Sequence, residues 1–283
     1  MKNITWQVLE SRCYAPYSGM DEICLVRGLS GILYPGTRVE NVSFPLSVDA
    51  VQAAVFSCLS EGDTPRSLIF PLSQNKKSSG RDTTREVSKR NKKRSDRSSA
   101  NIAGERDPCN NHMVRYWCDI YDLQCSSRQK PVGEYGEKLF LSNESVMDIA
   151  RLMELTERCV IPYSSFPVTA LLRADNGIFS GVNIETADWQ KGLCAERVAI
   201  AKAKASGAKV FQEIHVYAPK SDYVSPCGAC RQVLMEHMED GVMYLHHSDT
   251  ECSRLSVSDL LPYQFKAGNL GHQPSDQSTK TAR

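Results

Sequence analysis

The chain has 283 residues, 41% of them hydrophobic, and this length favours two modest hydrophobic cores over one large core. The formal net charge of +1 excludes a global electrostatic attraction to nucleic acid or to a membrane surface. The N-terminal segment MKNITWQVLE lacks a basic stretch followed by an apolar core, and no window approaches the roughly 18 apolar residues of a membrane span. We therefore expect a cytoplasmic protein without a membrane partner.

The eleven cysteines are the most informative feature of the composition. Their number is odd, the chain is too long to need disulfide staples, and several of them lie close to an acid, a histidine or a proline in metal-ligand spacings. This pattern favours thiols and a bound metal over disulfides.

A basic run occupies residues 75–100, with ten Lys or Arg against three Asp or Glu and almost no large apolar side chain. Such a segment cannot offset its ordering entropy, so we expect a disordered insertion at about 75–102 and, for the same reason, a disordered tail at 271–283. The cluster Lys89–Arg94 leaves nuclear targeting or a nucleic-acid contact open as alternatives to a solvated insert.

Helical and strand patterns are clearest in the second half of the chain. An apolar stripe at helical spacing predicts a helix over Ser145–Cys159. Two short β-rich runs, Val168–Arg173 and Ile178–Asn183, are joined by Ala-Asp-Asn-Gly, and Asn-Gly is a strong hairpin signal. We predict a β-hairpin there.

Two further helices carry the cysteines of interest. The run Leu193–Ala205 predicts a helix with Cys194 and Glu196 near its beginning. A buried strand is expected at Ile214–Ala218, and the segment from Pro226 onward predicts a second helix, with Cys227 and Cys230 in its first turn.

The first half of the chain resembles the second at an offset of about 145 residues. Glu40 falls under Glu185 and Ala50 under Ala195, but Asp49 stands in place of Cys194 and Val51 in place of Glu196. The nearest trace of the second cysteine segment is Pro-Cys-Asn-Asn-His at 108–112. The sequence therefore predicts a degenerate domain over residues 1–140, interrupted by the basic insertion, and a catalytic domain over 141–270.

The chemistry of the second half fits a hydrolytic zinc site, which needs three protein ligands, an open position for water and a group that moves protons. Cys194, Cys227 and Cys230 supply three thiolates from two helix N-termini, and Glu196 lies two residues after the first of them. Three thiolates around Zn²⁺ sum to minus one. We expect Arg197 and Arg231, which follow the ligand segments, to compensate this charge as outer neighbours of the metal.

The Cys-Ala-Glu-Arg segment at 194–197 and the Pro-Cys-Gly-Ala-Cys-Arg-Gln segment at 226–232 resemble those of the free-nucleoside cytidine deaminase family. Two more segments in the family's order, at 162–168 and 181–185, and Leu-Leu-Pro-Tyr-Gln-Phe near the end extend the resemblance over about residues 145–270. The segment Thr186–Gln190 departs from the family pattern, which leaves the choice between cytidine and deoxycytidine open.

The resemblance implies roles for further residues. Asn183 and Glu185 would hydrogen-bond the ribose hydroxyls, Phe166 would pack on the pyrimidine, and the carbonyl of Ser225 would approach the 4-amino group. The implied reaction is hydrolytic deamination to uridine or deoxyuridine in pyrimidine salvage, with Glu196 moving a proton from the zinc water to ring N3 and then to the departing ammonia.

Other readings of the same residues stay open. A closed zinc knot would take His215, His237, His246 or His247 as a fourth ligand, but it leaves Glu196 without a purpose. An RNA- or DNA-editing deaminase would use the basic insertion to hold polynucleotide, although that run contains no aromatic residue to stack bases. A non-catalytic regulator is the third possibility.

We therefore predict an α/β protein with two deaminase-like domains, each a mixed sheet of about five strands flanked by helices. The resemblance further implies a small nucleoside as substrate and a homodimer that imitates the tetramer of single-domain relatives, with a homotetramer as the alternative.

Overall fold

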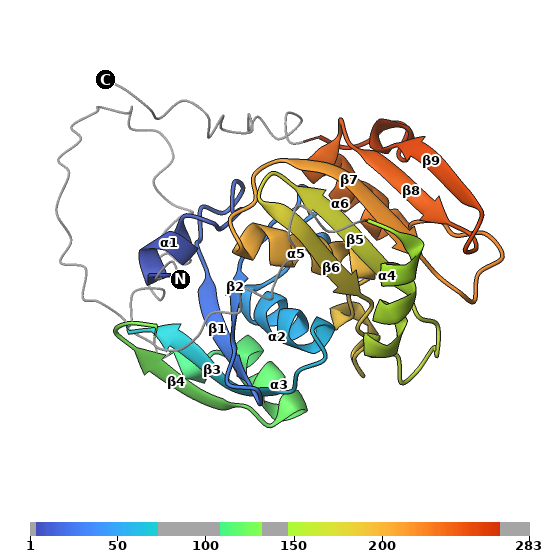
Figure 1. Cartoon of the computed structure of the whole chain (residues 1–283). Coiled ribbons are helices and arrows are strands. Elements are labelled where there is room, and N and C mark those ends of the chain that lie inside the picture. The colour runs from blue at the N-terminus through green and yellow to red at the C-terminus, as the bar shows by residue number, and fades with distance from the viewer. Residues whose placement is uncertain (1–3, 73–107, 132–146, 267–283) are drawn as a thin grey trace, which may run out of the picture.

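The computed structural model describes residues 4–72, 108–131 and 147–266 (Figure 1). The predicted basic insertion at 75–102, the predicted tail at 271–283 and the first two residues of the predicted helix at 145–159 lie outside the described residues. Within the described ranges no helix is long and apolar enough to cross a bilayer.

The first domain is a four-stranded mixed sheet with helices on both faces. Its strands have the spatial order β2-β1-β3-β4, with β1 antiparallel to β2 and β3, and β3 parallel to β4. The elements are α1 (Trp6–Glu10), β1 (Ile23–Gly28), β2 (Leu33–Thr37), α2 (Ala50–Ser60), β3 (Pro65–Pro71), α3 (His112–Tyr121) and β4 (Gln124–Arg128).

The second domain repeats this arrangement and adds one strand. Its spatial order is β6-β5-β7-β8-β9, with β5 antiparallel to β6 and β7, and β7 parallel to β8. The elements are α4 (Ile149–Leu155), β5 (Thr169–Ala174), β6 (Gly177–Val182), α5 (Ala195–Ala205), β7 (Phe211–Tyr217), α6 (Gly228–Met238), β8 (Val242–His246) and β9 (Cys252–Ser256). The predicted fold class is confirmed, although the sheet formed by the described residues of the first domain has four strands where about five were expected.

The two domains also match in detail where a helix crosses a strand. A Cβ added to Gly36 in β2 would lie 1.9 Å from the Ala50 carbonyl oxygen, and a Cβ added to Gly181 in β6 would lie 2.1 Å from that of Ala195. Only glycine permits such a close approach of helix and strand. The same residue therefore sets the same contact at the start of α2 and of α5.

The two domains share one core around the central helices α2 and α5, which lie next to each other (Figure 1). Ten of the eleven residues of α2 are buried, as expected for a helix covered on all sides. One apolar cluster continues from α2 into α5, with Val55, Phe56, Val198 and Ala201 among its members. The domains therefore form one body.

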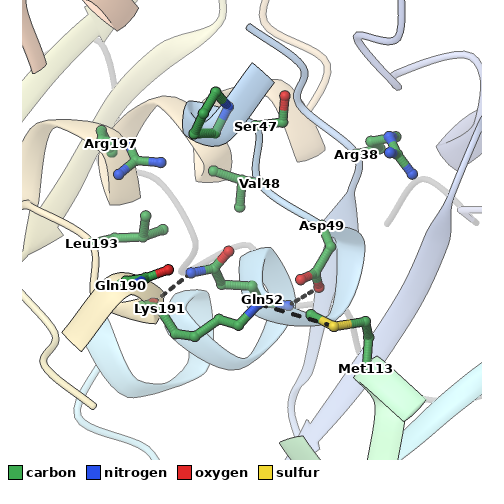
Figure 2. Close-up of a pocket in the computed structure, with 11 residues that line it drawn as sticks. Arg38, Ser47, Val48, Asp49, Gln52, Met113, Gln190, Lys191, Leu193 and Arg197 are labelled. Atoms are coloured by element: carbon green, nitrogen blue, oxygen red, sulfur yellow. Dashed lines mark hydrogen bonds between the residues drawn. The ribbon is translucent and has the colours of Figure 1, made fainter. Parts of the chain in front are cut away.

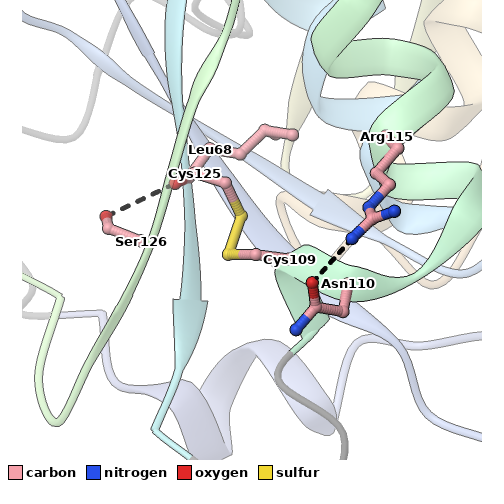
Figure 3. The surroundings of a disulfide bond; sticks show 6 residues. All are labelled: Leu68, Cys109, Asn110, Arg115, Cys125 and Ser126. Atoms are coloured by element: carbon pink, nitrogen blue, oxygen red, sulfur yellow. Dashed lines mark hydrogen bonds between the residues drawn. A yellow bond between two sulfur atoms is a disulfide. The ribbon is translucent and has the colours of Figure 1, made fainter.

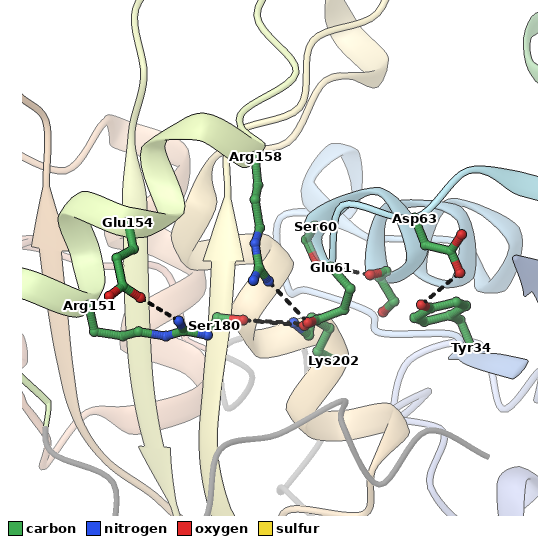
Figure 4. Close-up of polar contacts among 10 residues, drawn as sticks. Tyr34, Ser60, Glu61, Asp63, Arg151, Glu154, Arg158, Ser180 and Lys202 are labelled. Atoms are coloured by element: carbon green, nitrogen blue, oxygen red, sulfur yellow. Dashed lines mark hydrogen bonds and ion pairs between the residues drawn. The ribbon is translucent and has the colours of Figure 1, made fainter. Parts of the chain in front are cut away.

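An interdomain ion pair adds to this apolar contact at the C-terminal end of α5 (Figure 4). Lys202 of α5 is 1% exposed, and its ammonium group contacts Glu61, which follows α2 in the first domain. Ser180 accepts a second hydrogen bond from Lys202 at 3.0 Å, and Arg158 lies 3.3 Å from the other Glu61 oxygen. A buried lysine is thus neutralised across the domain boundary.

Several predicted elements occur with shifted ends. The helix predicted at Ser145–Cys159 begins at Ile149, because the Asp148 side chain accepts a hydrogen bond from the Arg151 amide as an N-cap. The predicted hairpin forms, but Ala174 pairs with Gly177, so the turn residues are Asp175 and Asn176. The two cysteine-bearing helices begin one residue after Cys194 and Cys227, which are their N-caps.

The expectation of thiols rather than disulfides is wrong for one pair. Cys109 and Cys125 form a disulfide, with their Cα atoms 5.8 Å apart (Figure 3). The parallel pairing of β4 with β3 brings Cys125 beside the short helical turn at Pro108–Asn110, a contact that sequence spacing does not reveal. The other nine cysteines are free.

Candidate functional site

Two helix N-termini of the second domain meet at the candidate site. Cys194 is the N-cap of α5, with φ −68° and ψ 158°, and Cys227 is the N-cap of α6, with φ −67° and ψ 167°. The Cys227 sulfur accepts a hydrogen bond of 3.4 Å from the Cys230 amide. The Cys194 side chain makes no such hydrogen bond, but both cysteines lie at the positive dipole end of a helix, a position that favours thiolate over thiol.

The three thiols form a compact cluster. The sulfurs of Cys194, Cys227 and Cys230 all lie within 4.8 Å of one another, and those of Cys194 and Cys227 are 3.6 Å apart. Tetrahedral Zn²⁺ with Zn–S bonds of about 2.3 Å requires sulfurs about 3.8 Å apart. Cys230 is buried whereas Cys227 is exposed, so the cluster is open on one side. The donor set fits a zinc ion with one position left for another ligand.

The thiols also share their protons unevenly. Hydrogen bonds from Cys194 and Cys230 lower the pKa of Cys227, while its hydrogen bond to Cys227 raises the pKa of Cys194. One thiolate at Cys227 is therefore favoured even before a metal supplies further positive charge. Deprotonation of the other two thiols would accompany metal binding.

Glu196 lies in the first turn of α5, beside the cluster. It is 3% exposed, and its Oε2 atom is buried without a hydrogen-bond partner among the described residues. Burial raises the pKa of Glu196 to about 7. A carboxyl with a pKa near neutrality can both accept and release a proton, so it suits general acid–base work on a ligand at the open position.

Arg231 and Arg197 hold the segments around the cluster. Arg231 donates from Nε to the Pro226 carbonyl at 2.9 Å and from Nη2 to the Ser225 hydroxyl at 2.9 Å, so it fixes the segment that leads to Cys227. Arg197 donates from Nη2 to the Leu46 carbonyl of the first domain at 2.9 Å, and its positive charge acts to lower the pKa of Glu196. Both arginines thus have a structural contact in addition to their expected charge effect.

The residues expected to bind ribose and base lie at the end of β6 and in the loop before β5. Asn183 donates from Nδ2 to the Phe166 carbonyl at 2.8 Å and accepts at Oδ1 from the Val168 amide at 2.9 Å. Phe166 is 37% exposed, so its ring is available on the surface. The Asn183 side chain therefore sets the position of the Phe166 loop.

Glu185 anchors the same loop. Its carboxylate accepts hydrogen bonds from the amides of Tyr163 at 3.0 Å and Ser164 at 3.1 Å, and from the Ser164 hydroxyl. Burial acts to raise the pKa of Glu185, but these hydrogen bonds outweigh it and the pKa is lowered. Glu40 receives the equivalent hydrogen bonds from Tyr17 and Ser18 in the first domain. The two copies keep these loop hydrogen bonds, although Glu40 also forms an ion pair with Arg38 at 3.2 Å.

The histidines considered as a fourth metal ligand are engaged elsewhere. His215 and His246 contact each other at 3.0 Å on β7 and β8, and His247 accepts from the Val224 amide at 3.1 Å. His237 packs edge-on against the Tyr14 ring of the first domain. Among the described residues, the metal-binding cluster contains the three cysteines and no histidine.

The equivalent place in the first domain does not offer these groups. Asp49 is the N-cap of α2 and accepts from the Gln52 amide at 2.7 Å, Val51 is apolar, and Cys109 is in the disulfide. A cavity of about 440 Å³ lies there, lined by Asp49 and Val51 among others.

Sequence reasoning missed the side chains that approach the site from outside the motifs. Gln52 of the first domain donates to the Lys191 carbonyl at 2.6 Å, and Lys220 donates to the Ser165 carbonyl at 2.5 Å next to Phe166 (Figure 2 shows the first contact). The repeat places Gln52 at the position equivalent to Arg197, which was the available signal. No comparable pattern marks Lys220.

Comparison with known proteins points to one family. Residues 142–246 match the family described as the cytidine and deoxycytidylate deaminase zinc-binding region. Cytidine deaminase from Sporosarcina psychrophila is 37% identical over 132 residues, which is 44% of this chain and 97% of that protein. Cytidine deaminase from Halalkalibacterium halodurans is 38% identical over 126 residues, which is 44% of this chain and 96% of that protein.

A solved structure is similar over the same share of the chain. The crystal structure of cytidine deaminase from Burkholderia pseudomallei has 35% sequence identity and a TM-score of 0.39, and the match covers 41% of this chain and 95% of that chain.

Proposed function

Because this chain belongs to the cytidine deaminase family and is a zinc-dependent hydrolase, we propose that residues 141–270 convert cytidine and deoxycytidine to uridine and deoxyuridine as free nucleosides in pyrimidine salvage. The observation that carries the proposal is the association of three thiols within 4.8 Å with a buried carboxylate oxygen that has no hydrogen-bond partner in the described part of the chain. A structural zinc site would have no use for that oxygen.

The cysteines and Glu196 have separate roles in the reaction. Cys194, Cys227 and Cys230 would hold the zinc ion, which supplies Lewis acidity that lowers the pKa of a neighbouring water molecule. Glu196, with a pKa of about 7, takes a proton from the attacking water and delivers it to ring N3. After the hydroxyl group has added at C4, the Glu196 carboxylate takes the proton of that hydroxyl and passes it to the amine. The C4–N bond breaks as the C4 carbonyl forms, so that one water is consumed and one ammonia is released.

Substrate binding is assigned to the loop and strand end beside the cluster. Asn183 and Glu185 bind the ribose hydroxyls with the hydrogen-bonding capacity that their loop contacts leave unused, and the Phe166 ring packs on the pyrimidine. The Ser225 carbonyl accepts a hydrogen bond from the 4-amino group, and Arg231 supports this by holding the Ser225 hydroxyl and the Pro226 carbonyl.

The first domain, residues 1–140, contributes no catalytic centre in this proposal. Asp49 and Val51 stand at the positions equivalent to Cys194 and Glu196, and neither can take over their roles. The proposed role of the first domain is structural. The proposed oligomer is a homodimer of two copies of the whole chain.

The test is an absorbance assay with zinc-loaded protein on cytidine, deoxycytidine and a cytosine-containing oligonucleotide. Loss of the cytosine absorbance of the nucleosides, abolished by Glu196→Gln with zinc retained, supports the proposal. Conversion of the oligonucleotide alone would replace it with a polynucleotide-editing activity. No conversion of any of the three would refute an active site here.

A further inference from the structure

Two hydrogen bonds cross the domain boundary at the N-terminal ends of the central helices. The Gln52 side chain of α2 donates to the Lys191 carbonyl at 2.6 Å, and the Arg197 side chain of α5 donates to the Leu46 carbonyl at 2.9 Å. Each helix thus reaches into the loop that precedes the other helix, and Figure 2 shows the contact from Gln52 to Lys191. A pocket of about 210 Å³ lies between them and is lined by all of these residues except Leu46.

The two bonds are equivalent in the internal repeat. Gln52 and Arg197 differ by 145 positions, as do Leu46 and Lys191. They are therefore two copies of one contact, each of which runs from one domain to the other. Only the hydrogen bond donated by Gln52 holds the loop that leads to the thiol cluster.

Lys191 is close to the cluster in the chain, three residues before Cys194. The segment between them is short and held at both ends. Gln52 holds the Lys191 carbonyl, and Leu193 pairs with Ile184 through two backbone hydrogen bonds of 3.0 Å. The Lys191 side chain also contacts the first domain, with its ammonium 4.0 Å from the Met113 sulfur and 5.7 Å from the Tyr116 ring centroid. The backbone and the side chain of Lys191 are therefore both fixed by the degenerate domain.

The donor of this hydrogen bond is a buried side chain. Gln52 is 5% exposed, although glutamine is a residue type that is mostly found on protein surfaces. Without its amide, the Lys191 carbonyl would lose this donor, and the loop would no longer be tied to the first domain at that point. A movement of the loop would pass directly to Cys194 and the first turn of α5.

We propose that Gln52 is a positioning residue for the zinc site, through which the degenerate domain fixes the loop that carries Cys194 and thereby the orientation of Glu196. This inference rests on the proposed function for its kinetic consequence. It gives the first domain a task in the reaction although Asp49 and Val51 stand where the second domain has Cys194 and Glu196.

The test compares two variants of Gln52 with a matched control on the full-length, zinc-loaded protein. Gln52→Met keeps the length of the side chain without a donor, and Gln52→Asn keeps the amide but is too short to reach. The control is Lys202→Met, which also removes an interdomain contact of α5 but lies eight residues after Cys194, about 12 Å along the helix. Zinc release to a chromogenic chelator and the separate values of kcat and KM for cytidine are measured at a temperature where all variants are folded.

Both Gln52 variants should release zinc faster and have a lower kcat, each by about twofold to tenfold, which is the net worth of one intramolecular hydrogen bond. Their KM should stay within about twofold of wild type, and Lys202→Met should match wild type in zinc release and kcat. Wild-type zinc release and kcat in both Gln52 variants would overturn the proposal, as would an equal loss in Lys202→Met. If the wild type binds zinc but does not convert cytidine, the proposed function fails, while zinc release still tests the positioning role.

Discussion

The ion pair between Lys202 and Glu61 gives a sharp test of how the two domains are joined. Lys202 is 1% exposed, and the Glu61 side chain is 16% exposed and also contacts Arg158. Removing one charge of the pair therefore leaves the other charge in a different situation, depending on which of the two residues is replaced. Glu61→Gln leaves a buried ammonium group without a negative partner, whereas Lys202→Met leaves a partly exposed carboxylate that still has Arg158.

The expected magnitudes follow from this asymmetry. Breaking a buried pair by removing one partner costs about 3–5 kcal/mol, and the residual carbonyl oxygen of glutamine reduces this to about 3 kcal/mol for Glu61→Gln. Replacement of a buried charge by an apolar side chain of similar volume is often neutral, so Lys202→Met should cost about 1 kcal/mol or less. Glu61→Gln should thus destabilise the protein far more than Lys202→Met does.

Urea unfolding followed by far-ultraviolet circular dichroism measures both free energies. The midpoint should shift strongly for Glu61→Gln and little for Lys202→Met, with the slope unchanged in both. A cost below about 1 kcal/mol for Glu61→Gln, or an equal cost for the two variants, would show that Lys202 is not held as a buried, paired charge.

Three further predictions concern the site and the second sheet. Glu185→Gln should lower kcat/KM for cytidine by about 10-fold to 100-fold, because it removes a charged hydrogen-bond acceptor. The equivalent variant Glu40→Gln should keep kcat/KM within about twofold of wild type. Equal losses in the two variants would contradict a ribose-binding role for Glu185. Burial and the neighbouring His246 lower the pKa of His215 to about 4, whereas an unfolded histidine has a pKa of about 6.5. Between these two values the unfolded state binds more protons than the folded state. The melting temperature should therefore fall as the pH decreases from about 6.5 towards 4. His215→Phe, which keeps a ring against Tyr244, should flatten this dependence, and an unchanged pH dependence would exclude His215 as a source. Removal of zinc by a chelator should lower the melting temperature of the wild type but not of Cys227→Ala, and a melting temperature insensitive to the chelator would argue against a zinc site at the three thiols.

Much of the fold was predictable because it depends on local patterns. The hairpin of β5 and β6 follows from alternating β-rich residues around a tight turn, and α5 follows from its Ala-rich periodicity. The ends were less predictable, since caps such as Asp148 compete with the apolar pattern for the first residue of a helix. The repeat was visible because both copies keep residues of the same type at the same spacing, such as Glu40 and Glu185.

The sequence by itself determined which groups meet at the candidate site, because Cys194, Glu196 and the Cys227–Cys230 pair stand at spacings that two helix N-termini can bring together. Only the tertiary structure decided which distant groups surround them. The disulfide of Cys109 with Cys125, the pairing of Glu61 with Lys202 and the bond from Gln52 to Lys191 join residues that are 16, 141 and 139 positions apart. Such contacts depend on how the helices and sheets pack, and no local spacing encodes them.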